Sequence, residues 1–353
     1  MLECKGATYN NDLLIAIQHS VGIEKLRNVS ILITGATGTL GSFLVDVLLK
    51  YNQQENANIT IYAAGRNLVK LEELFGKVPD KNLIYVLHHL EQPIQFDFSV
   101  DYIIHTAGNA NPNAFRENPV GTLMGIVLGT YNLLEFGRRV KIKRFLYVST
   151  AEVYGEMVPS RFSTSENDSG YVNPLAFRSC YPSAKRVAET LCVSAMHQYQ
   201  MDAVICRPCH TYGPCITSAD NRAHAQFFKR ALNRQDIVLK SAATQIRSYT
   251  YIGDCASALL TVLVNGKGAE AYNVANSSSI VSIADFARTI AQKAQIRVLF
   301  DTPSQIDLQS RCPISRQVLN VDKLKHLGWK ESFSLEKGVA HTLQILQDWS
   351  SWL

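Results

Sequence analysis

The chain has 353 residues, of which 46% are hydrophobic and 18% are charged, and its formal net charge is +5. This length suits one large two-lobed globule or two domains and favours an enzyme over a small binding module. The modest charge, without a dense Lys/Arg block, argues against nucleic acid as a partner, and the eight cysteines lack the spacing of a metal site.

The first 28 residues predict an N-terminal helical extension, because Leu13, Leu14, Ile17 and Val21 fall on one helical stripe. The N-terminus has no basic segment followed by an apolar core, and no run reaches the roughly 18 apolar residues of a membrane span. We therefore expect a cytoplasmic protein that makes no membrane contact, with its cysteines reduced. The extension itself suggests no function.

Residues 29–207 alternate between strand and helix patterns. Apolar runs predict buried strands at residues 29–34, 59–64, 83–87, 102–105, 145–149 and 203–207. Helical periodicity separates most of them, for example at 40–49 and 123–136. This alternation predicts an α/β protein with a Rossmann-type doubly wound parallel sheet, and residues 29–207 form its predicted dinucleotide-binding domain.

The first predicted strand is followed by Gly35, Gly38 and Gly41, at three-residue intervals where a helix begins. Such glycines let the backbone turn tightly and approach a pyrophosphate, which the amides of the helix N-terminus then hold. Because a strand precedes the motif and a helix follows it, we expect this turn, including Thr37, Thr39 and Leu40, to bind a dinucleotide.

The second predicted strand ends without the acidic residue that commonly binds the adenosine ribose. The sequence there is Tyr-Ala-Ala-Gly-Arg, ending at Arg66. Three alternative roles for Arg66 have equal weight. Its side chain accepts a 2′-phosphate, or it stacks on adenine, or it is only a solvated loop cation. NADP therefore stays open beside NAD.

The strand at 145–149 leads into Thr150 and Glu152. Ligands in open α/β sheets bind at the carboxyl ends of strands, so this position would deliver a hydroxyl and a carboxylate to a site. The alternative is a strand end with a capping threonine.

Tyr181 and Lys185 lie one helical turn apart, after a turn-rich loop and with Pro182 suited to the first turn. An adjacent ammonium stabilises a phenolate and so lowers the pKa of a tyrosine. Tyr181 would then be a general base that removes a hydroxyl proton while a hydride leaves for nicotinamide.

Beyond residue 207 the regular alternation ends, and residues 208–244 and 277–353 predict a smaller, mixed α/β substrate-binding lobe. Residues 245–276 are expected to return to the first domain. Within them, the apolar segments 248–252 and 272–274 predict further strands of its sheet.

Taken together, the three motifs resemble those of the extended short-chain dehydrogenase/reductase family, and more narrowly of the NAD-dependent epimerase/dehydratase enzymes that modify nucleotide sugars. Residues 30–332 are most similar to the UDP-glucuronate decarboxylases. The likeness lies in residues 91–94, 105–107, 129–133, 149–155, 173–174, 178–181, 185–190, 207–214 and 327–329. The Asn-Pro at 173–174 followed by Arg-Ser-Cys-Tyr at 178–181 is its most specific part.

This resemblance implies roles for individual residues. Thr150 would bind the C4 hydroxyl of the sugar, Lys185 would orient the cofactor ribose, and Glu152 would face the reacting sugar. The cofactor would be NAD and would also contact Ala107. The implied substrate-binding residues are Thr150, Arg178, His210, Arg222, Arg247 and Arg316, although an isolated arginine is often only part of a surface ion pair. The helices at 123–136 and 185–197 would form a homodimer interface.

Departures from the family pattern keep the reaction open. Ala151 stands where decarboxylases have serine and 4,6-dehydratases have an aspartate, and His210 replaces an asparagine that touches substrate phosphate. Ala151 matches 4-epimerases, whereas Glu152 matches decarboxylases and dehydratases. We therefore predict a decarboxylase of a nucleotide-linked uronic acid, with a 4-epimerase, a 4,6-dehydratase or an NADP-dependent sugar or polyol reductase as alternatives.

Overall fold

Seven parallel strands form the central sheet in a computed structural model of the chain, which describes residues 2, 5–77, 79–158, 162–217, 220–303 and 314–350. The strand order is β3-β2-β1-β4-β5-β6-β11, so the order reverses between β1 and β4, and a ligand crevice is expected there. The strands are β1 (Ser30–Thr34), β2 (Thr60–Gly65), β3 (Leu83–Leu87), β4 (Tyr102–His105), β5 (Arg144–Val148), β6 (Ala203–Pro208) and β11 (Ala271–Val274). The predicted Rossmann-type α/β fold is confirmed.

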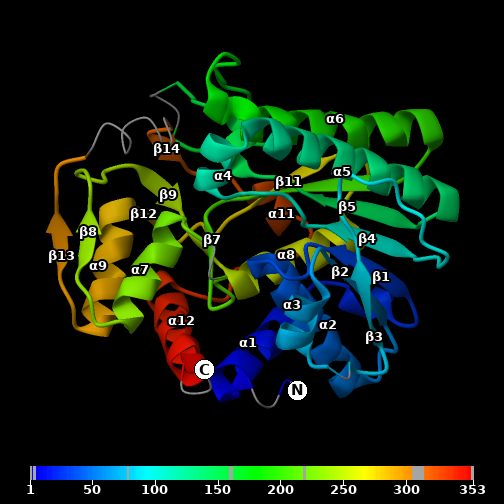
Figure 1. Cartoon of the computed structure of the whole chain (residues 1–353), viewed down its shortest axis with the longest axis horizontal. Helices are drawn as coiled ribbons and strands as arrows, with labels where there is room; N and C mark the ends of the chain where they lie inside the picture. The colour runs from blue at the N-terminus through cyan, green and yellow to red at the C-terminus, as the bar shows by residue number, and fades with distance from the viewer. Residues whose placement is uncertain are drawn as a thin grey trace.

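Helices cover both faces of this sheet (Figure 1). Helices α5 (Pro119–Val140) and α6 (Cys180–Tyr199) pack on one face, and α2 (Thr39–Glu55) and α8 (Ile252–Asn265) pack on the other. With both faces covered, the strands bury continuous apolar runs: Ile31, Leu32 and Ile33 of β1 are all fully buried. This is why their sequence shows no alternation of polar and apolar residues.

The second lobe is a mixture of short strands and helices, as its sequence predicted. Its strands are β8 (Ile237–Leu239), β9 (Ile246–Ser248), β12 (Ile280–Ser282), β13 (Val298–Phe300) and β14 (Arg316–Gln317), and its helices are α7 (Ala223–Leu232), α9 (Ile283–Ala294) and α12 (Leu335–Ser350). The remaining short elements are α1 (Ala7–Gln18), α3 (Leu68–Phe75), α4 (Pro112–Glu117), α11 (Asp322–Lys325), β7 (Thr211–Tyr212), β10 (Thr250–Tyr251), η2 (Ile23–Leu26), η3 (Ala151–Tyr154) and η4 (Phe177–Ser179).

One predicted strand of the central sheet was wrong. Residues 248–252 do not join that sheet, because β9 pairs with β12 and β14, and β10 pairs with β7. Residues 250–251 are therefore a strand, but of a separate two-stranded sheet, and the chain enters α8 directly after them at Ile252. The companion expectation for residues 272–274 is confirmed, since β11 pairs with β6 at the edge of the sheet. The division into domains stays a prediction.

The predicted N-terminal helix is α1, and it lies between α2 and α12 (Figure 1). Two fully buried carboxylates anchor it. Asp12 accepts a hydrogen bond of 2.5 Å from the Tyr251 hydroxyl and pairs with His341 Nδ1 at 2.7 Å, while the Tyr9 hydroxyl donates to Asp46 at 2.6 Å. Helix α1 therefore joins the first lobe to the second.

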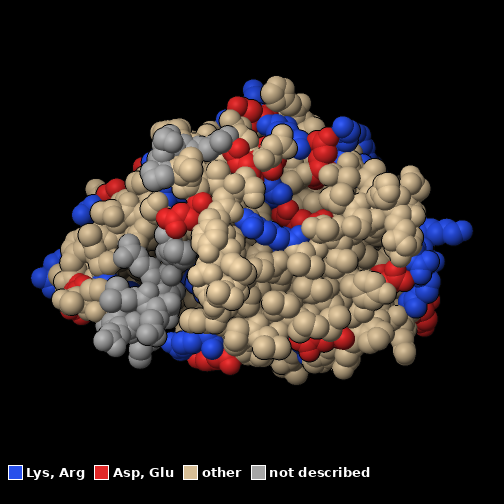
Figure 2. All heavy atoms as spheres, turned by 90° about the horizontal axis from the view of Figure 1, so that it is seen from above, with Lys and Arg blue, Asp and Glu red and all other residues tan. Residues whose placement is uncertain are grey.

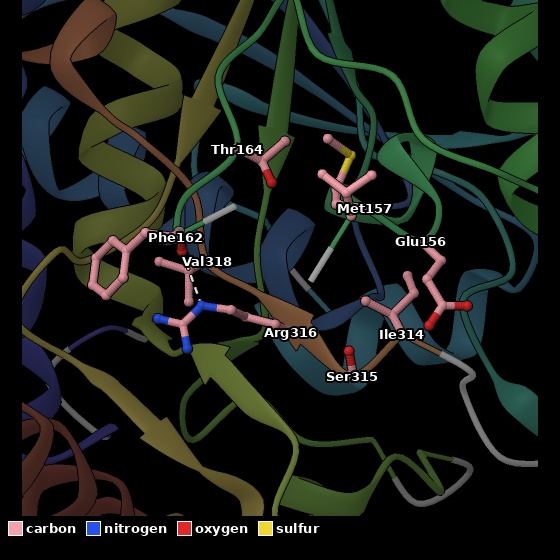
Figure 3. A pocket seen from close by; sticks show the side chains of 9 residues that line it. Glu156, Met157, Phe162, Thr164, Ile314, Ser315, Arg316 and Val318 are labelled. Atoms are coloured by element: carbon pink, nitrogen blue, oxygen red, sulfur yellow. Dashed lines mark hydrogen bonds between the residues drawn. The ribbon is translucent and has the colours of Figure 1, made fainter. Parts of the chain in front are cut away.

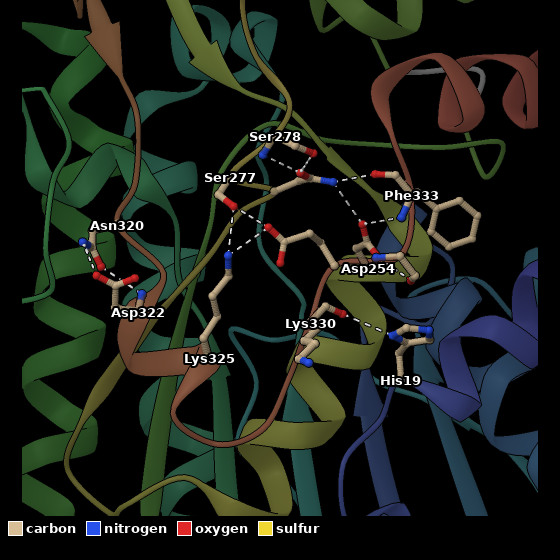
Figure 4. Close-up of polar contacts among 12 residues, drawn as sticks. His19, Asp254, Ser277, Ser278, Asn320, Asp322, Lys325, Lys330 and Phe333 are labelled. Atoms are coloured by element: carbon tan, nitrogen blue, oxygen red, sulfur yellow. Dashed lines mark hydrogen bonds and ion pairs between the residues drawn. The ribbon is translucent and has the colours of Figure 1, made fainter.

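A second anchor fixes the segment before α12 to the start of α8 (Figure 4). The buried carboxylate of Asp254 accepts hydrogen bonds from the Ser332 amide at 2.8 Å, the Ser332 hydroxyl at 2.7 Å and the Phe333 amide at 3.3 Å. Burial raises the pKa of Asp254 above its usual value, and these hydrogen bonds act in the opposite direction. Nearby, His19 Nδ1 lies 3.3 Å from the Lys330 carbonyl oxygen.

Candidate active site

The glycine turn after β1 is shaped for close backbone approach. Gly35 has a φ of +72°, and the Gly38 amide donates to its carbonyl at 2.9 Å. A Cβ on Gly35 would lie 2.8 Å from Ala107 Cα, and one on Gly41 would lie 2.2 Å from the Gly35 oxygen, so neither position accepts a side chain. No described side chain caps the first turn of α2, which leaves its amides available to a phosphate. These features fit the pyrophosphate of a dinucleotide.

Two other residues expected to contact the cofactor lie near this turn, and one of them, Arg66, is exposed to solvent. Thr37 approaches the end of β2, where a Cβ on Gly65 would lie 3.2 Å from Thr37 Cγ2. Arg66 directly follows β2 and is exposed to solvent. From the second lobe, Arg222 reaches the same turn, with Nη2 placed 3.5 Å from the hydroxyl oxygen of Thr39.

Tyr181 lies at the start of α6 and is 6% exposed, with its ring stacked on Phe115 at 4.8 Å between centroids. Burial raises the pKa of its phenol to about 12, and the charge of Glu152 adds to this effect. Three other groups oppose it by favouring the phenolate, and these are the Thr150 side chain and the guanidinium groups of Arg222 and Arg178. The structure thus brings Thr150, Glu152, Arg178 and Arg222 together around Tyr181.

Lys185 lies one turn further along α6 and is 4% exposed. Its ammonium donates to the Val148 carbonyl at 2.8 Å and lies 4.6 Å from the centre of the Tyr147 ring. Burial lowers the pKa of Lys185 to about 8, while Glu189 acts to raise it. The expectation that Lys185 lowers the pKa of Tyr181 stays a prediction, since the groups that shift this pKa here are Thr150, Glu152, Arg178 and Arg222, and burial has the largest effect.

Glu152 and Arg178, which the sequence analysis treated separately, form a two-pronged ion pair. The Arg178 Nη1 atom donates to Glu152 Oε2 at 2.7 Å, and Nη2 donates to Oε1 at 3.0 Å. Glu152 lies in η3 at the end of β5 and Arg178 in η4 just before α6, so the pair connects the two elements that carry Thr150 and Tyr181. Such paired hydrogen bonds fix the orientation of both side chains.

A buried network to which the sequence analysis gave no role lies next to this pair. The Ser149 hydroxyl donates to Glu189 Oε1 at 2.5 Å, and Arg207 holds the same carboxylate through Nε at 2.9 Å and Nη2 at 2.6 Å. One sequence signal could have indicated it, since Glu189 falls four residues after Lys185 on the same helical face. No sequence pattern indicated the stacking of Phe115 on Tyr181.

The second lobe contributes a cluster of basic side chains. Arg247 is 2% exposed, and its guanidinium donates to the backbone carbonyls of residues 246, 314 and 315, while no described carboxylate forms an ion pair with it. His210 has a φ of +35° and lies 2.8 Å from Gln317 Oε1 through Nε2. Burial has the largest effect and the charge of Arg247 the second largest, and together they lower the pKa of His210 to about 3. The described hydrogen-bond partners of the buried Arg247 guanidinium are carbonyl oxygens, which carry no net charge, so its positive charge suits an anionic ligand.

The last two predicted arginines differ in their surroundings. Arg222 is held by Asp220, to which Nη2 donates at 2.5 Å and Nε at 3.0 Å. Arg316 instead lines a small pocket of about 90 Å³ (Figure 3). There its Nε donates to the Phe162 carbonyl at 2.9 Å, and its guanidinium lies 4.6 Å from the centre of the Phe162 ring.

Sequence comparison places these features among known proteins. The model of the NAD dependent epimerase/dehydratase family matches residues 31–275. UDP-glucuronic acid decarboxylase 3 of Arabidopsis thaliana is 32% identical over 317 residues, which cover 88% of this chain and 87% of that protein. UDP-glucuronic acid decarboxylase 1 of Xenopus tropicalis is 33% identical over 319 residues, covering 90% of this chain and 72% of that protein.

Solved structures with the same fold act on several nucleotide sugars. An epimerase from Methanothermobacter thermautotrophicus has a TM-score of 0.79 at 21% identity and covers 96% of this chain and 97% of its own. The dTDP-glucose 4,6-dehydratase DesIV of Streptomyces venezuelae, solved with NAD bound, has a TM-score of 0.77 at 20% identity and covers 92% of this chain and 98% of its own. At these identities the likeness concerns the fold.

Proposed function

The chain belongs to the NAD-dependent epimerase/dehydratase family, and from this premise we propose that it decarboxylates a nucleotide-linked hexuronic acid, with UDP-glucuronate the first candidate. The sugar would be oxidised at C4, lose carbon dioxide from C5, and then take the hydride back. The reaction would be redox-neutral overall, so the cofactor would not be consumed.

The pair of Glu152 and Arg178 beside Tyr181 is the observation that carries this proposal. Once C4 is a ketone, the C5 carboxylate belongs to a β-keto acid, and carbon dioxide leaves readily. The resulting enolate must then gain a proton at C5 from a positioned acid. A guanidinium binds a carboxylate by two hydrogen bonds, and both Nη atoms of Arg178 now hold Glu152. The substrate carboxylate would replace Glu152 on Arg178, which would release Glu152 for the proton transfer.

The remaining residues have roles that follow from their positions. Tyr181 would take the proton of the C4 hydroxyl, Thr150 would hold that oxygen, and Lys185 would contact the cofactor ribose. The buried guanidinium of Arg247 suits the diphosphate of the nucleotide. When bound at the glycine turn, NAD supplies the hydride acceptor for this chemistry.

A panel of nucleotide sugars analysed by mass spectrometry tests the reaction. A nucleotide-linked hexuronic acid should lose the mass of carbon dioxide and yield a pentose. Loss of the mass of water would indicate a dehydratase, and retention of all carbon with an inverted centre would indicate a 4-epimerase.

Specific observations support two alternatives. A 4-epimerase is supported by Ala151, which is 2% exposed and places no acid directly after Thr150. An NADP-dependent reductase is supported by the exposed Arg66 and by the absence of a carboxylate at the end of β2. An absorption spectrum of the purified protein distinguishes a reductase from the other two enzymes. An enzyme that returns its hydride tends to retain its cofactor, whereas a reductase releases it.

The proposal includes a homodimer built on α5 and α6. These helices pack together and present a broad face with few charged side chains (Figure 2). Its exposed apolar side chains are Val120, Met124, Tyr131, Val187, Val193 and Tyr199. An apolar surface of this extent commonly marks a protein interface. Light scattering at micromolar concentration should give twice the mass of the chain, and a Val187→Glu variant should shift the mass toward the monomer.

A cytoplasmic location completes the proposal. Among the described residues, Cys180, Cys192, Cys206, Cys215 and Cys255 are free thiols, as is common in a reducing compartment. Within those ranges no helix combines the length and the hydropathy needed to cross a membrane. Cell fractionation tests the location.

A further inference from the structure

The carboxylate of Glu189 joins three elements of the candidate active site. Glu189 is 8% exposed, and three donors fill its two oxygens: the Ser149 hydroxyl and two nitrogens of Arg207. Ser149 directly precedes Thr150, and Arg207 lies near the end of β6. One side chain of α6 therefore holds the carboxyl ends of β5 and β6.

The hydrogen bonds of Arg207 extend this network. Its Nη1 atom donates to the Tyr154 hydroxyl at 3.0 Å and to the Glu166 carbonyl at 2.8 Å, and the Tyr154 hydroxyl donates to Asn273 Oδ1 at 2.6 Å. Burying an ion pair removes hydration from both charges, which offsets most of its electrostatic gain. The network is therefore a weak source of stability, but it restricts how the catalytic strand can move relative to α6.

Glu189 also sets the charge around Lys185. The described titratable groups around Lys185 are His105 of β4, Tyr147 of β5, and Glu189 and Cys192 of α6, with Tyr181 one helical turn before it. Burial lowers the pKa of His105 and raises the pKa values of the two tyrosines and of Cys192, so these four are neutral at neutral pH. Of these five groups only Glu189 is an anion.

We propose that Glu189 is a positioning residue of this active site: its carboxylate holds Ser149, and through it Thr150, against α6, and supplies the negative charge opposite the Lys185 ammonium. The catalytic consequence rests on the proposed function. The electrostatic effect of Glu189 on Lys185 does not rest on the proposed function, so it can be measured without a substrate.

The substrate-free experiment compares the free energy of unfolding of the full chain with that of a Lys185→Met variant, from about pH 6 to about pH 10. A lysine whose folded pKa lies below its unfolded pKa adds stability as the pH rises between the two values, because the unfolded chain still binds the proton. In a Glu189→Gln background this rise should begin at least about one pH unit lower than in the wild type. An unchanged onset would overturn the electrostatic part of the proposal.

Asp202→Asn is the matched control. Arg144 at the start of β5 holds Asp202, just before β6, through hydrogen bonds of 2.9 and 2.6 Å, which resembles the Arg207–Glu189 pair at the opposite end of the same strands. In this variant the rise in the free energy of unfolding that Lys185 causes should begin at the same pH as in the wild type. If Glu189→Gln does not fold, the double variant Glu189→Gln, Arg207→Gln replaces it, since it also removes the guanidinium that Glu189→Gln alone would leave without its carboxylate.

Steady-state kinetics test the positioning part. Ser149→Ala keeps both charges and removes only the hydrogen bond next to Thr150, so kcat should fall about 10-fold with KM nearly unchanged. Glu189→Asp should preserve the alkaline limb of the pH profile, whereas Glu189→Gln should move it to lower pH. A wild-type kcat in Ser149→Ala would overturn the positioning part. If the wild type converts no nucleotide sugar, the proposed function fails while the unfolding measurement still decides on Glu189.

Discussion

Tyr181 is a phenol whose pKa the surrounding protein raises. Burial brings this pKa to about 12, although Thr150 and two arginines favour the phenolate. At neutral pH the residue is therefore protonated until a positive ligand lowers its pKa, and the nicotinamide ring of NAD⁺ carries such a charge. In the proposed reaction, bound NAD⁺ would therefore favour the loss of the Tyr181 proton.

Replacing Tyr181 by phenylalanine should abolish turnover and leave NAD binding nearly unchanged, because the change removes a proton acceptor but no phosphate contact. Turnover and NAD affinity, measured on the same preparation, check this. Tyr171→Phe, at a side chain that is 68% exposed, is the control and should turn over like the wild type. Retention of more than a few per cent of activity in Tyr181→Phe would assign the base elsewhere.

Glu152→Gln addresses the proton transfer at C5. The variant should lose about 10²-fold or more in rate, the usual scale for a general acid or base, because glutamine cannot donate a proton at neutral pH. In D₂O the wild type should place deuterium at C5 of the pentose. Near-normal turnover of the variant, or a product that keeps all its carbon, would favour epimerisation.

At the scale of elements, most of the first lobe could be predicted because its strands are continuous apolar runs and its glycine turn has no other simple explanation. Residues 83–87 and 102–105 were predicted with the bounds that β3 and β4 have. Residues 248–252 do contain strand residues, but we assigned them to the wrong sheet, because an apolar run indicates a buried strand without indicating which strand it pairs with.

The candidate site was predictable only where a motif marks it. Thr150, Tyr181 and Lys185 stand in such motifs, and the structure does bring Thr150 to Tyr181. The pairing of Glu152 with Arg178 and the stacking of Phe115 on Tyr181 depend on how η3, η4 and α4 meet in space. Local sequence carries no information about those contacts.

Helix α1 should contribute measurably to stability. Tyr9→Phe should lower the free energy of unfolding by about 1–3 kcal/mol, because it removes a hydrogen bond from a buried carboxylate. In this variant Asp46 keeps its ion pair with Lys5 Nζ at 2.6 Å, but it loses its other partner, and its Oδ1 already has no described partner. Urea unfolding measures the change, with Tyr171→Phe again as the control. An unchanged midpoint in Tyr9→Phe would mean that this hydrogen bond does not hold α1 in place.

For the molecule as a whole, buried neutral histidines predict sensitivity to acid. Burial lowers the pKa of His210 and His224 to about 3 and that of His105 well below its usual value. In the unfolded chain each would titrate near pH 6.5, so the unfolded state binds more protons below that pH. Stability should be full above about pH 6.5 and fall by up to about 1.4 kcal/mol per pH unit for each histidine below it.

Urea unfolding at pH values between about 7 and about 5 measures this slope. His224→Gln should reduce it, whereas His197→Gln, at an exposed position, should leave it unchanged. Equal slopes in all three proteins would show that His224 is protonated in the folded state.

The position of α1 also bears on how the chain reaches its fold during synthesis. Helix α1 precedes in the chain the partners that hold it: Asp12 pairs with Tyr251 and His341, and the indole of Trp349 donates to the Lys5 carbonyl at 3.0 Å. Contacts so distant in sequence form slowly, because a long loop must close before they can stabilise anything. Part of the surface of α1 therefore stays uncovered until α8 and α12 have been translated, and a helix in this position depends on chaperones or on rapid release for protection from aggregation.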